Sequence, residues 1–284
     1  MPELIPRIRT AAFLMIFGSL FGLFAAMLIA SLFVTDLGDI EALQLALMVG
    51  ELLIPVPILL WARRMKSPLQ DFFRLHPVRR ESIVTAIPIG IGMVILVDEL
   101  DRIFQKLIPL PGGFDQLGEV MRIHDLWSGM ILIGVIVIFG PLVEELIFRG
   151  FFQRVLEFRL KDVTRAALIS ALVFALVHFN PWWIVQIYLI GLLLGYMAWR
   201  TNSIWIPAIL HAMNNGFSLL FTNSMEELPA WYEWRGHVSP PILIVGAALF
   251  FLGMKAFIAV TPVAPRDEDV IFIEEAQDQS RPPI

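Results

Sequence analysis

Two adjacent carboxylates, Glu144 and Glu145, follow an apolar stretch, residues 126–143, that contains no charged side chain. Ionisable side chains are costly inside a membrane, and those that occur there usually face a water-filled cavity or the protein interior and serve a function. Neighbouring residues of a helix point about 100° apart, so the two carboxylates cannot share one direction. Arg149 lies four residues after Glu145 and can pair with it. Glu144 is therefore the carboxylate expected to face a cavity and to act as a general acid or base.

Few other polar side chains lie within the apolar stretches. His178 ends one stretch, and His211 and Asn215 lie one helical turn apart on the same face of another. A single buried histidine is more often a packing residue that makes a hydrogen bond than a catalyst. A carboxylate, two imidazoles, an amide and a paired guanidinium on three neighbouring stretches are harder to explain by packing, and together they indicate an active site.

Three short motifs closely resemble the signature motifs of the CAAX protease and bacteriocin-processing family of intramembrane proteases. They are Glu144-Glu145-x-x-x-Arg149, Phe174-x-x-x-His178 and His211-x-x-x-Asn215. The eukaryotic members of this family are the type II CAAX prenyl endopeptidases. The resemblance covers about residues 126–221. It implies an eight-helix fold around an intramembrane cavity that opens toward the cytoplasm, and it implies peptide-bond hydrolysis.

The resemblance also implies a role for each motif residue. Glu144 and His178 would activate a water for attack on the scissile carbonyl, and His211 with Asn215 would stabilise the oxyanion that develops. Amide hydrolysis requires a base, an oxyanion donor and an acid for the leaving group, and this set supplies all three without Ser or Cys. We therefore expect an endopeptidase of the glutamate type or a metalloendopeptidase.

The remaining motif pair, Glu145 and Arg149, would fix the helix end. A tetrahedral zinc with an open position could also be held, through Glu144, His178 and His211. In that arrangement the only free base would be Glu145, which is already assigned to Arg149. The metal-free reaction is therefore favoured, zinc stays open, and no cofactor is assigned.

The partner expected from the resemblance is a peptide or protein substrate that is lipidated or embedded in the bilayer. Processing of prenylated proteins is what the resemblance suggests. Two alternatives stay open. One is a transporter or proton-relay protein, in which intramembrane Glu and His are equally expected, and Glu51 is the acid outside the motif region that fits it. The other is a catalytically inactive, family-like scaffold or immunity protein that acts by binding.

The composition indicates a polytopic membrane protein, because 57% of the residues are hydrophobic, 17% are charged and the mean hydropathy is +0.74. Several of the apolar stretches are shorter than the ~20 residues that cross the hydrocarbon core as a helix. The stretches are residues 11–34, 42–62, 83–97, 126–143, 166–177, 183–199, 204–221 and 242–260. We therefore predict an all-α polytopic membrane protein with about eight transmembrane helices.

The basic residues indicate the orientation, because Lys and Arg in loops are held on the cytoplasmic side. If the N-terminus is cytoplasmic, all but four of the 21 Lys and Arg residues fall on that side. The exceptions are Arg102, Lys106, Arg122 and Arg235. Eight spans then place both termini in the cytoplasm. The absence of an ER retention signal and the compact length favour a bacterial cytoplasmic membrane.

The composition also excludes some function classes. The net charge of −5 gives no case for binding nucleic acid. The absence of cysteine excludes disulfides, thiol catalysis and thiolate metal ligands. We expect a single transmembrane domain over residues 1–260, followed by an acidic, disordered cytoplasmic tail over residues 261–284.

Helix geometry predicts how far the fourth stretch continues. With a rise of ~1.5 Å per residue, Glu144 would lie nearly at the cytoplasmic surface if the helix ended there, whereas the two histidines would lie deeper. We therefore expect the helix to continue through Phe148 to Leu156, which lowers Glu144 into the membrane. Two pairs of small residues predict close helix packing. They are Gly18/Gly22 and Gly191/Gly195.

Overall fold

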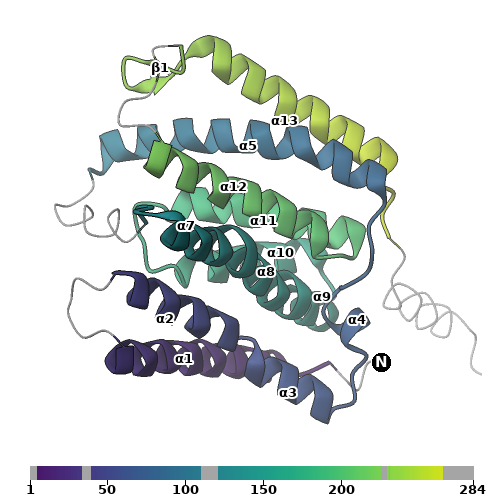
Figure 1. Cartoon of the computed structure of the whole chain (residues 1–284). Coiled ribbons are helices and arrows are strands. Elements are labelled where there is room, and N and C mark those ends of the chain that lie inside the picture. Colours follow the sequence, from purple (N-terminus) through teal and green to yellow (C-terminus); the bar gives the residue numbers. More distant parts are fainter. Residues whose placement is uncertain (1–4, 34–39, 110–120, 225–228, 230, 265–284) are drawn as a thin grey trace, which may run out of the picture.

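The apolar stretches of the sequence form helices that run side by side in the computed structural model of the protein (Figure 1). The structure describes residues 5–33, 40–109, 121–224, 229 and 231–264, so most of the expected acidic tail lies outside the described residues. The elements are α1 (Ile8–Phe33), α2 (Ile40–Leu53), α3 (Val56–Arg64), α4 (Leu69–Phe72), α5 (Arg80–Leu107), α7 (Leu126–Leu132), η2 (Ile133–Phe139), α8 (Gly140–Glu145), η3 (Leu146–Phe152), α9 (Gln153–Leu160), α10 (Val163–Leu176), α11 (Ile184–Thr201), α12 (Trp205–Ser224), the antiparallel hairpin β1 (Glu233–Trp234) with β2 (His237–Val238), and α13 (Pro240–Val260).

Six helical segments in the described part of the chain are long and apolar enough to cross a membrane. They are Ile8–Leu32, Ala42–Arg64, Arg80–Leu107, Leu126–Leu160, Ile184–Thr201 and Pro240–Val260. This confirms the prediction of an all-α, multi-pass membrane protein. The other two predicted stretches form α10, with 14 residues, and α12, with 20. Neither is among the six segments, so the count of eight spans stays a prediction.

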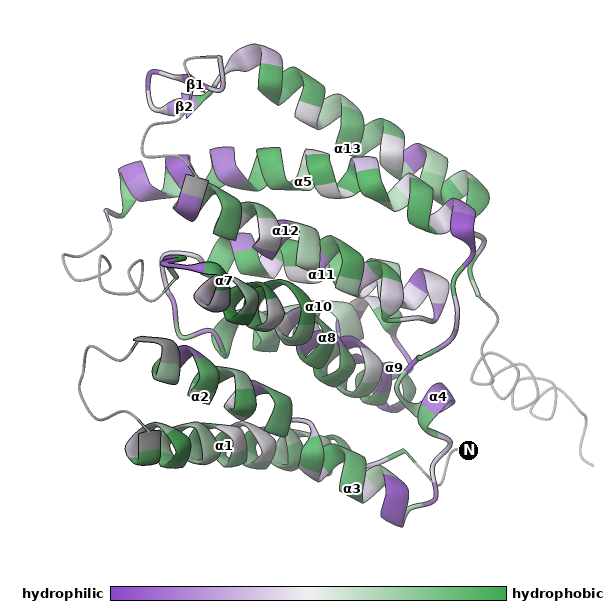
Figure 2. Cartoon of the chain, in the orientation of Figure 1, coloured by the Kyte–Doolittle hydropathy of each residue, from purple (hydrophilic) through white to green (hydrophobic). Residues whose placement is uncertain are grey.

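The outward faces of the helices are apolar, as a lipid environment requires (Figure 2). Large side chains are exposed along them, such as Phe24 of α1, which is 67% exposed, and Phe251 of α13, which is 66% exposed. Exposed apolar surface of this extent is unusual for a soluble protein and normal where lipid covers it. Hydrophilic residues gather toward the helix ends, where the protein meets headgroups and water (Figure 2).

Two clusters of buried apolar side chains hold the bundle together. One joins α1, α3, η3 and α9 around residues such as Phe151. The other joins α5, α11, α12 and α13 around residues such as Met197. The close packing predicted for the first glycine pair is confirmed, because a Cβ on Gly22 of α1 would lie 2.5 Å from the carbonyl oxygen of Gly50 in α2. Small residues thus set the distance between these helices.

The helix that carries the first motif is continuous from α7 through α9, over Leu126–Leu160. Its first turn is capped by Asp125, whose Oδ1 accepts a 2.8 Å hydrogen bond from the backbone N–H of Ser128. It ends at Lys161, whose left-handed backbone, with a φ of 53°, stops the helix. The prediction that this helix continues past the carboxylates is confirmed, and it places Glu144 near the middle of the span.

Two wide, π-helical stretches, η2 and η3, flank the short segment α8 that carries the carboxylates. In η2 the N–H of Gly140 donates to the carbonyl of Val135, five residues earlier. The next residue, Pro141, has no N–H to donate to the carbonyl of Ile136. A Cβ on residue 140 would lie 2.6 Å from the Val135 oxygen, so this turn requires glycine. The Gly-Pro sequence therefore explains the wide turn just before Glu144.

Candidate active site

Glu145 connects α8 with two other elements of the site. Its Oε1 accepts hydrogen bonds from Nη1 of Arg149, at 2.7 Å, and from Nδ1 of His211, at 2.9 Å. All three side chains are buried. The predicted pair of Glu145 and Arg149 is confirmed, whereas the contact with His211 comes from the packing of α12 against α8 and was not predicted. A buried charge is tolerated only with such partners, so Glu145 holds α12 in place.

Glu144 points away from this pair. Its Oε2 lies 3.6 Å from Nε2 of His211. This oxygen is buried and has no hydrogen-bond partner among the described residues. The Glu144 side chain is 27% exposed, whereas that of Glu145 is 0% exposed. The separation of the two carboxylates that helical geometry predicts is therefore present. A buried polar atom without a partner is costly, and in a cavity wall it indicates a binding position for water or a substrate group.

His178 follows α10 and has a fixed ring orientation. Its Nδ1 lies 2.7 Å from the backbone oxygen of Phe174. A carbonyl oxygen can only accept, so Nδ1 carries the proton and Nε2 is left as the acceptor. His211 is held in the same way, because its Nδ1 donates to Glu145 while its Nε2 faces Glu144. Each imidazole is therefore oriented through one nitrogen and keeps the other for chemistry.

The ring of Phe174 lies among these side chains and orients three of them. The guanidinium carbon of Arg149 lies 4.2 Å from its centroid. The rings of His178 and His211 meet the Phe174 ring edge to face, with centroids 4.8 Å and 5.7 Å away. Phe174 belongs to the second motif, but no function was predicted for it from the sequence. In the structure its ring packs against three of the predicted site residues.

Two glycines of α11 support the motif helix. Nη2 of Arg149 donates to the carbonyl of Gly191 at 3.2 Å, and Nε2 of Gln153 donates to the carbonyl of Gly195 at 3.0 Å. A Cβ on Gly195 would lie 2.9 Å from Oε1 of Gln153, so a larger residue would disturb this contact. The predicted close packing of this glycine pair is confirmed. The same packing supplies the buried Arg149 with an acceptor besides Glu145.

Asn215 lines the cavity from α12, but part of its amide is already engaged. Its Nδ2 donates to the carbonyl of Ile136 at 3.1 Å, which is the carbonyl that Pro141 leaves without a partner in the helix. Its Oδ1 accepts from Nδ2 of Asn214 at 3.3 Å. Asn215 therefore ties α12 to the wide turn of η2. An amide nitrogen carries two hydrogens, so one N–H remains for a substrate.

The predicted site residues meet at a cavity of about 340 Å³ between the helices. Four of them line it, namely Glu144, His178, His211 and Asn215. The other two, Glu145 and Arg149, are buried in the protein and contact the lining residues. Tertiary packing therefore brings together all six residues from three separate segments of the chain.

A larger apolar groove, of about 590 Å³, meets the cavity at Glu144 and His178. Met15 and Leu20 of α1 line one side of the groove, and Val173 of α10 lines another. The two spaces share Glu51, Glu144 and His178. A molecule bound beside Glu144 can thus place a polar part in the cavity and an apolar part in the groove.

Glu51 of α2 is a cavity residue that the motif spacing did not assign. It lines both the cavity and the apolar groove together with Glu144, and the two carboxylates are close enough for their charges to interact. The signal in the sequence was an isolated acid in an apolar stretch, which fitted the transporter alternative. The structure places it beside the motif residues instead. Among the described residues that line the cavity, there is no Lys or Arg.

The candidate zinc ligands do not converge. In the described ranges, no three His, Asp or Glu side chains lie together in a way that could hold a metal ion. Glu144, His178 and His211 line one cavity but do not form such a group as they are placed. The residues as placed do not fit a zinc centre, and we derive no catalytic step through one.

The fold and the candidate site define a multi-pass membrane protein with a polar cavity beside the middle of its motif helix. Residues 126–217 match the sequence model of the family described as "Type II CAAX prenyl endopeptidase Rce1-like". The segment that carries the three motifs is thus similar to this family, which confirms the resemblance.

A curated relative matches over part of the chain. It is named "Putative membrane peptidase YdiL", from Bacillus subtilis (strain 168), and it is 32% identical over 91 residues. The match covers 32% of this chain and 36% of the relative, so the chain spans about a third of the length of the curated relative that it matches. No solved structure gives a significant match. The similarity to this relative therefore concerns about a third of the chain.

Proposed function

We propose that this protein is an intramembrane endopeptidase of the glutamate type, in which Glu144 and His178 activate a water that hydrolyses a peptide bond. The observation that carries this proposal is the unpartnered Oε2 of Glu144 in a cavity that two imidazoles also line. The match of the motif segment to the CAAX prenyl endopeptidase family supports the reaction class.

The reaction can be written from the geometry. A water bound between Oε2 of Glu144 and Nε2 of His178 gives a proton to Glu144 while its oxygen attacks the scissile carbonyl carbon. The oxyanion is stabilised by the free N–H of Asn215 and by a protonated His211, whose charge Glu145 balances. Cleavage of the C–N bond then passes the proton from Glu144 to the leaving amine. Glu145 is a positioning residue, because it acts through His211.

The substrate is proposed to be a peptide or protein with an apolar group close to the cleaved bond. The apolar groove supports this, because it meets the cavity at Glu144 and His178. A lipidated or membrane-embedded substrate would place its peptide bond in the cavity and its apolar group in the groove. Processing of prenylated CAAX proteins is the version of this proposal that the family match suggests.

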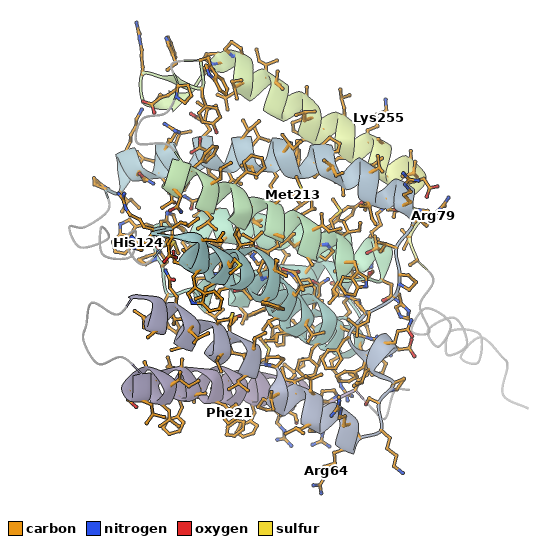
Figure 3. All side chains as sticks on the ribbon, in the orientation of Figure 1. Phe21, Arg64, Arg79, His124, Met213 and Lys255 are labelled. Carbon is orange, nitrogen blue, oxygen red and sulfur yellow. The ribbon has the colours of Figure 1, made fainter. Side chains whose placement is uncertain are left out.

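The location and domain structure also stay proposals. We propose a single transmembrane domain over residues 1–260 in a bacterial cytoplasmic membrane, with both termini in the cytoplasm. The distribution of basic side chains supports the orientation, since Arg64, Arg79 and Lys255 lie toward the same end of the bundle (Figure 3).

A peptidase assay on the purified protein tests the proposed function. Glu144→Gln keeps the side-chain volume and removes the base, so turnover of quenched fluorogenic peptides should fall by at least ~10²-fold, the lower range for general-base catalysis. Thermal stability should stay at the wild-type value. Glu81→Gln, the same change at the exposed start of α5, is the matched control and should keep full activity.

Retained turnover in a stable Glu144→Gln protein would exclude Glu144 as the base. Activity that disappears on thorough chelation and returns with zinc would replace the metal-free scheme. The two alternatives to an enzyme give other results in the same preparation. A proton-relay transporter would move protons across liposomes without cutting peptides, and an inactive scaffold would do neither.

A further inference from the structure

The active-site cavity extends toward one end of the bundle. Trp183, which precedes α11, lines it, as do Ser218 and Leu219 near the end of α12 and Met121 just before α7. Asn223 of α12 ties these segments together, because its Oδ1 accepts from the backbone N–H of Ile123 at 2.7 Å. The cavity therefore runs from Glu144 toward the helix ends at which residues 121–125 lie.

The apolar groove continues on the opposite side of Glu144, where Ile147 and Phe152 of η3 line it. Packed side chains lie beside the groove, because Phe151 is 0% exposed and Leu156 is 2% exposed in the cluster that joins α1, α3, η3 and α9. Beyond them, Arg74 and Glu157 form a buried ion pair. The half of the motif helix before Glu144 thus lies beside the polar cavity, whereas the half after it, the packed half, lies beside the apolar groove and the buried cluster.

The packed half faces the basic end of the molecule. His124 lies at one end of the bundle, whereas Arg64, Arg79 and Lys255 lie toward the other (Figure 3). Basic residues are held on the cytoplasmic side of a membrane. With cytoplasmic termini, the polar cavity therefore extends away from the cytoplasm, whereas the sequence predicts that it opens toward the cytoplasm.

We propose that the active-site cavity opens on the extracytoplasmic side, and that its substrates are exported peptides or the outward-facing parts of membrane proteins, in place of the prenylated CAAX proteins that the family match suggests. The substrate class rests on the proposed endopeptidase function. The direction of opening does not, because it follows from the cavity lining and the distribution of Lys and Arg.

The chain contains no cysteine, so single cysteines can be introduced without a background. Ser218→Cys places a thiol in the cavity, and Met121→Cys is a second variant at its mouth. His124→Cys marks the same end of the bundle on an exposed surface, and Arg64→Cys marks the basic end. Bacterial cells producing each variant are converted to spheroplasts and treated with a membrane-impermeant maleimide, before or after permeabilisation.

The thiols at residues 218, 121 and 124 should be labelled in intact spheroplasts, and the thiol at residue 64 only after permeabilisation. Labelling of residue 64 in intact spheroplasts would overturn the proposed orientation. If residue 124 is labelled from outside while 218 and 121 react only after permeabilisation or in detergent, the outward opening is wrong.

The peptidase assay separates this inference from the proposed function. If purified wild-type protein cuts no peptide while the labelling pattern holds, the endopeptidase assignment fails and the direction of opening stands. If peptides are cut but the labelling pattern is reversed, this inference alone fails. In an active protein, maleimide attached to Ser218→Cys should block turnover, because residue 218 lines the cavity.

Discussion

At the scale of single residues, adjacent carboxylates have opposite environments. Glu145 is fully buried and its Oε1 accepts hydrogen bonds from Arg149 and His211, whereas the Glu144 side chain is 27% exposed and lines the cavity. One carboxylate therefore stabilises the fold and the other is available to a substrate. Mutations of the two should have different effects on stability.

Glu145→Ala should lower the free energy of unfolding as well as activity, because it leaves the guanidinium of Arg149 buried without its charged partner. Removing one member of a buried pair costs ~3–5 kcal/mol. The double variant Glu145→Ala with Arg149→Ala removes both charges and should lose less than the sum of the two single variants. Denaturant or thermal unfolding in detergent measures the free energy of unfolding of the wild type, the two single variants and the double variant. Strictly additive losses would show that the pair contributes no coupling energy.

At the scale of elements, the wide turn of η2 sets the direction in which the two carboxylate side chains point. Gly140 donates to the carbonyl of Val135 across this turn, and Pro141 leaves the Ile136 carbonyl to Asn215. A change in the number of residues per turn rotates every side chain that follows it. The direction of Glu144 is therefore set by a backbone irregularity and by a contact with another helix.

Pro141→Ala should separate activity from stability. An alanine N–H can donate to the carbonyl of Val137, four residues earlier as in a regular α-helix, and an interior proline costs a helix ~3 kcal/mol, so the variant should be at least as stable as the wild type. If the helix then tightens, Glu144 turns away from His178 and peptide turnover falls. Pro57→Ala in α3 is a control at a proline outside the cavity lining. Full activity in Pro141→Ala would show that the wide turn does not depend on the proline.

At the scale of the whole molecule, the residues that follow α13 make hydrogen bonds to other helices at the basic end of the bundle. Oγ1 of Thr261 lies 2.8 Å from Oγ of Ser82, and the carbonyl of Thr261 accepts from Nε of Arg200 at 2.7 Å. The backbone N–H of Ala264 donates to the carbonyl of Arg200 at 2.9 Å. These contacts carry the packed structure past the proposed boundary at residue 260, as far as Ala264.

Truncation should test that boundary. A chain that stops after Ala264 keeps these contacts and should unfold at the wild-type temperature. A chain that stops after Val260 loses the hydrogen bonds of Thr261 and Ala264 and should be less stable by ~1 kcal/mol for each lost bond. Thermal unfolding of both proteins in the same detergent measures the difference. If both truncated chains match the wild type, the domain ends before Thr261, and equal losses in both would place part of it in the removed segment.

The sequence by itself determined the class of protein and most of the site. Apolar stretches that lipid must cover fix an all-α membrane fold, and helical periodicity alone separates Glu144 from Glu145 and pairs the latter with Arg149, because these relations are local to one helix. The three motifs were sufficient to predict the similarity to the family, which the match to residues 126–217 confirmed.

Only the tertiary structure decided which residues meet across helices. The contact of Glu145 with His211, the place of Phe174 among the site residues and the presence of Glu51 in the cavity all depend on how α2, α10 and α12 pack against the motif helix. The direction in which the cavity runs depends on the same packing. Spacing along a chain specifies neighbours on one helix, whereas the distance between side chains on different helices follows from packing that no local pattern contains.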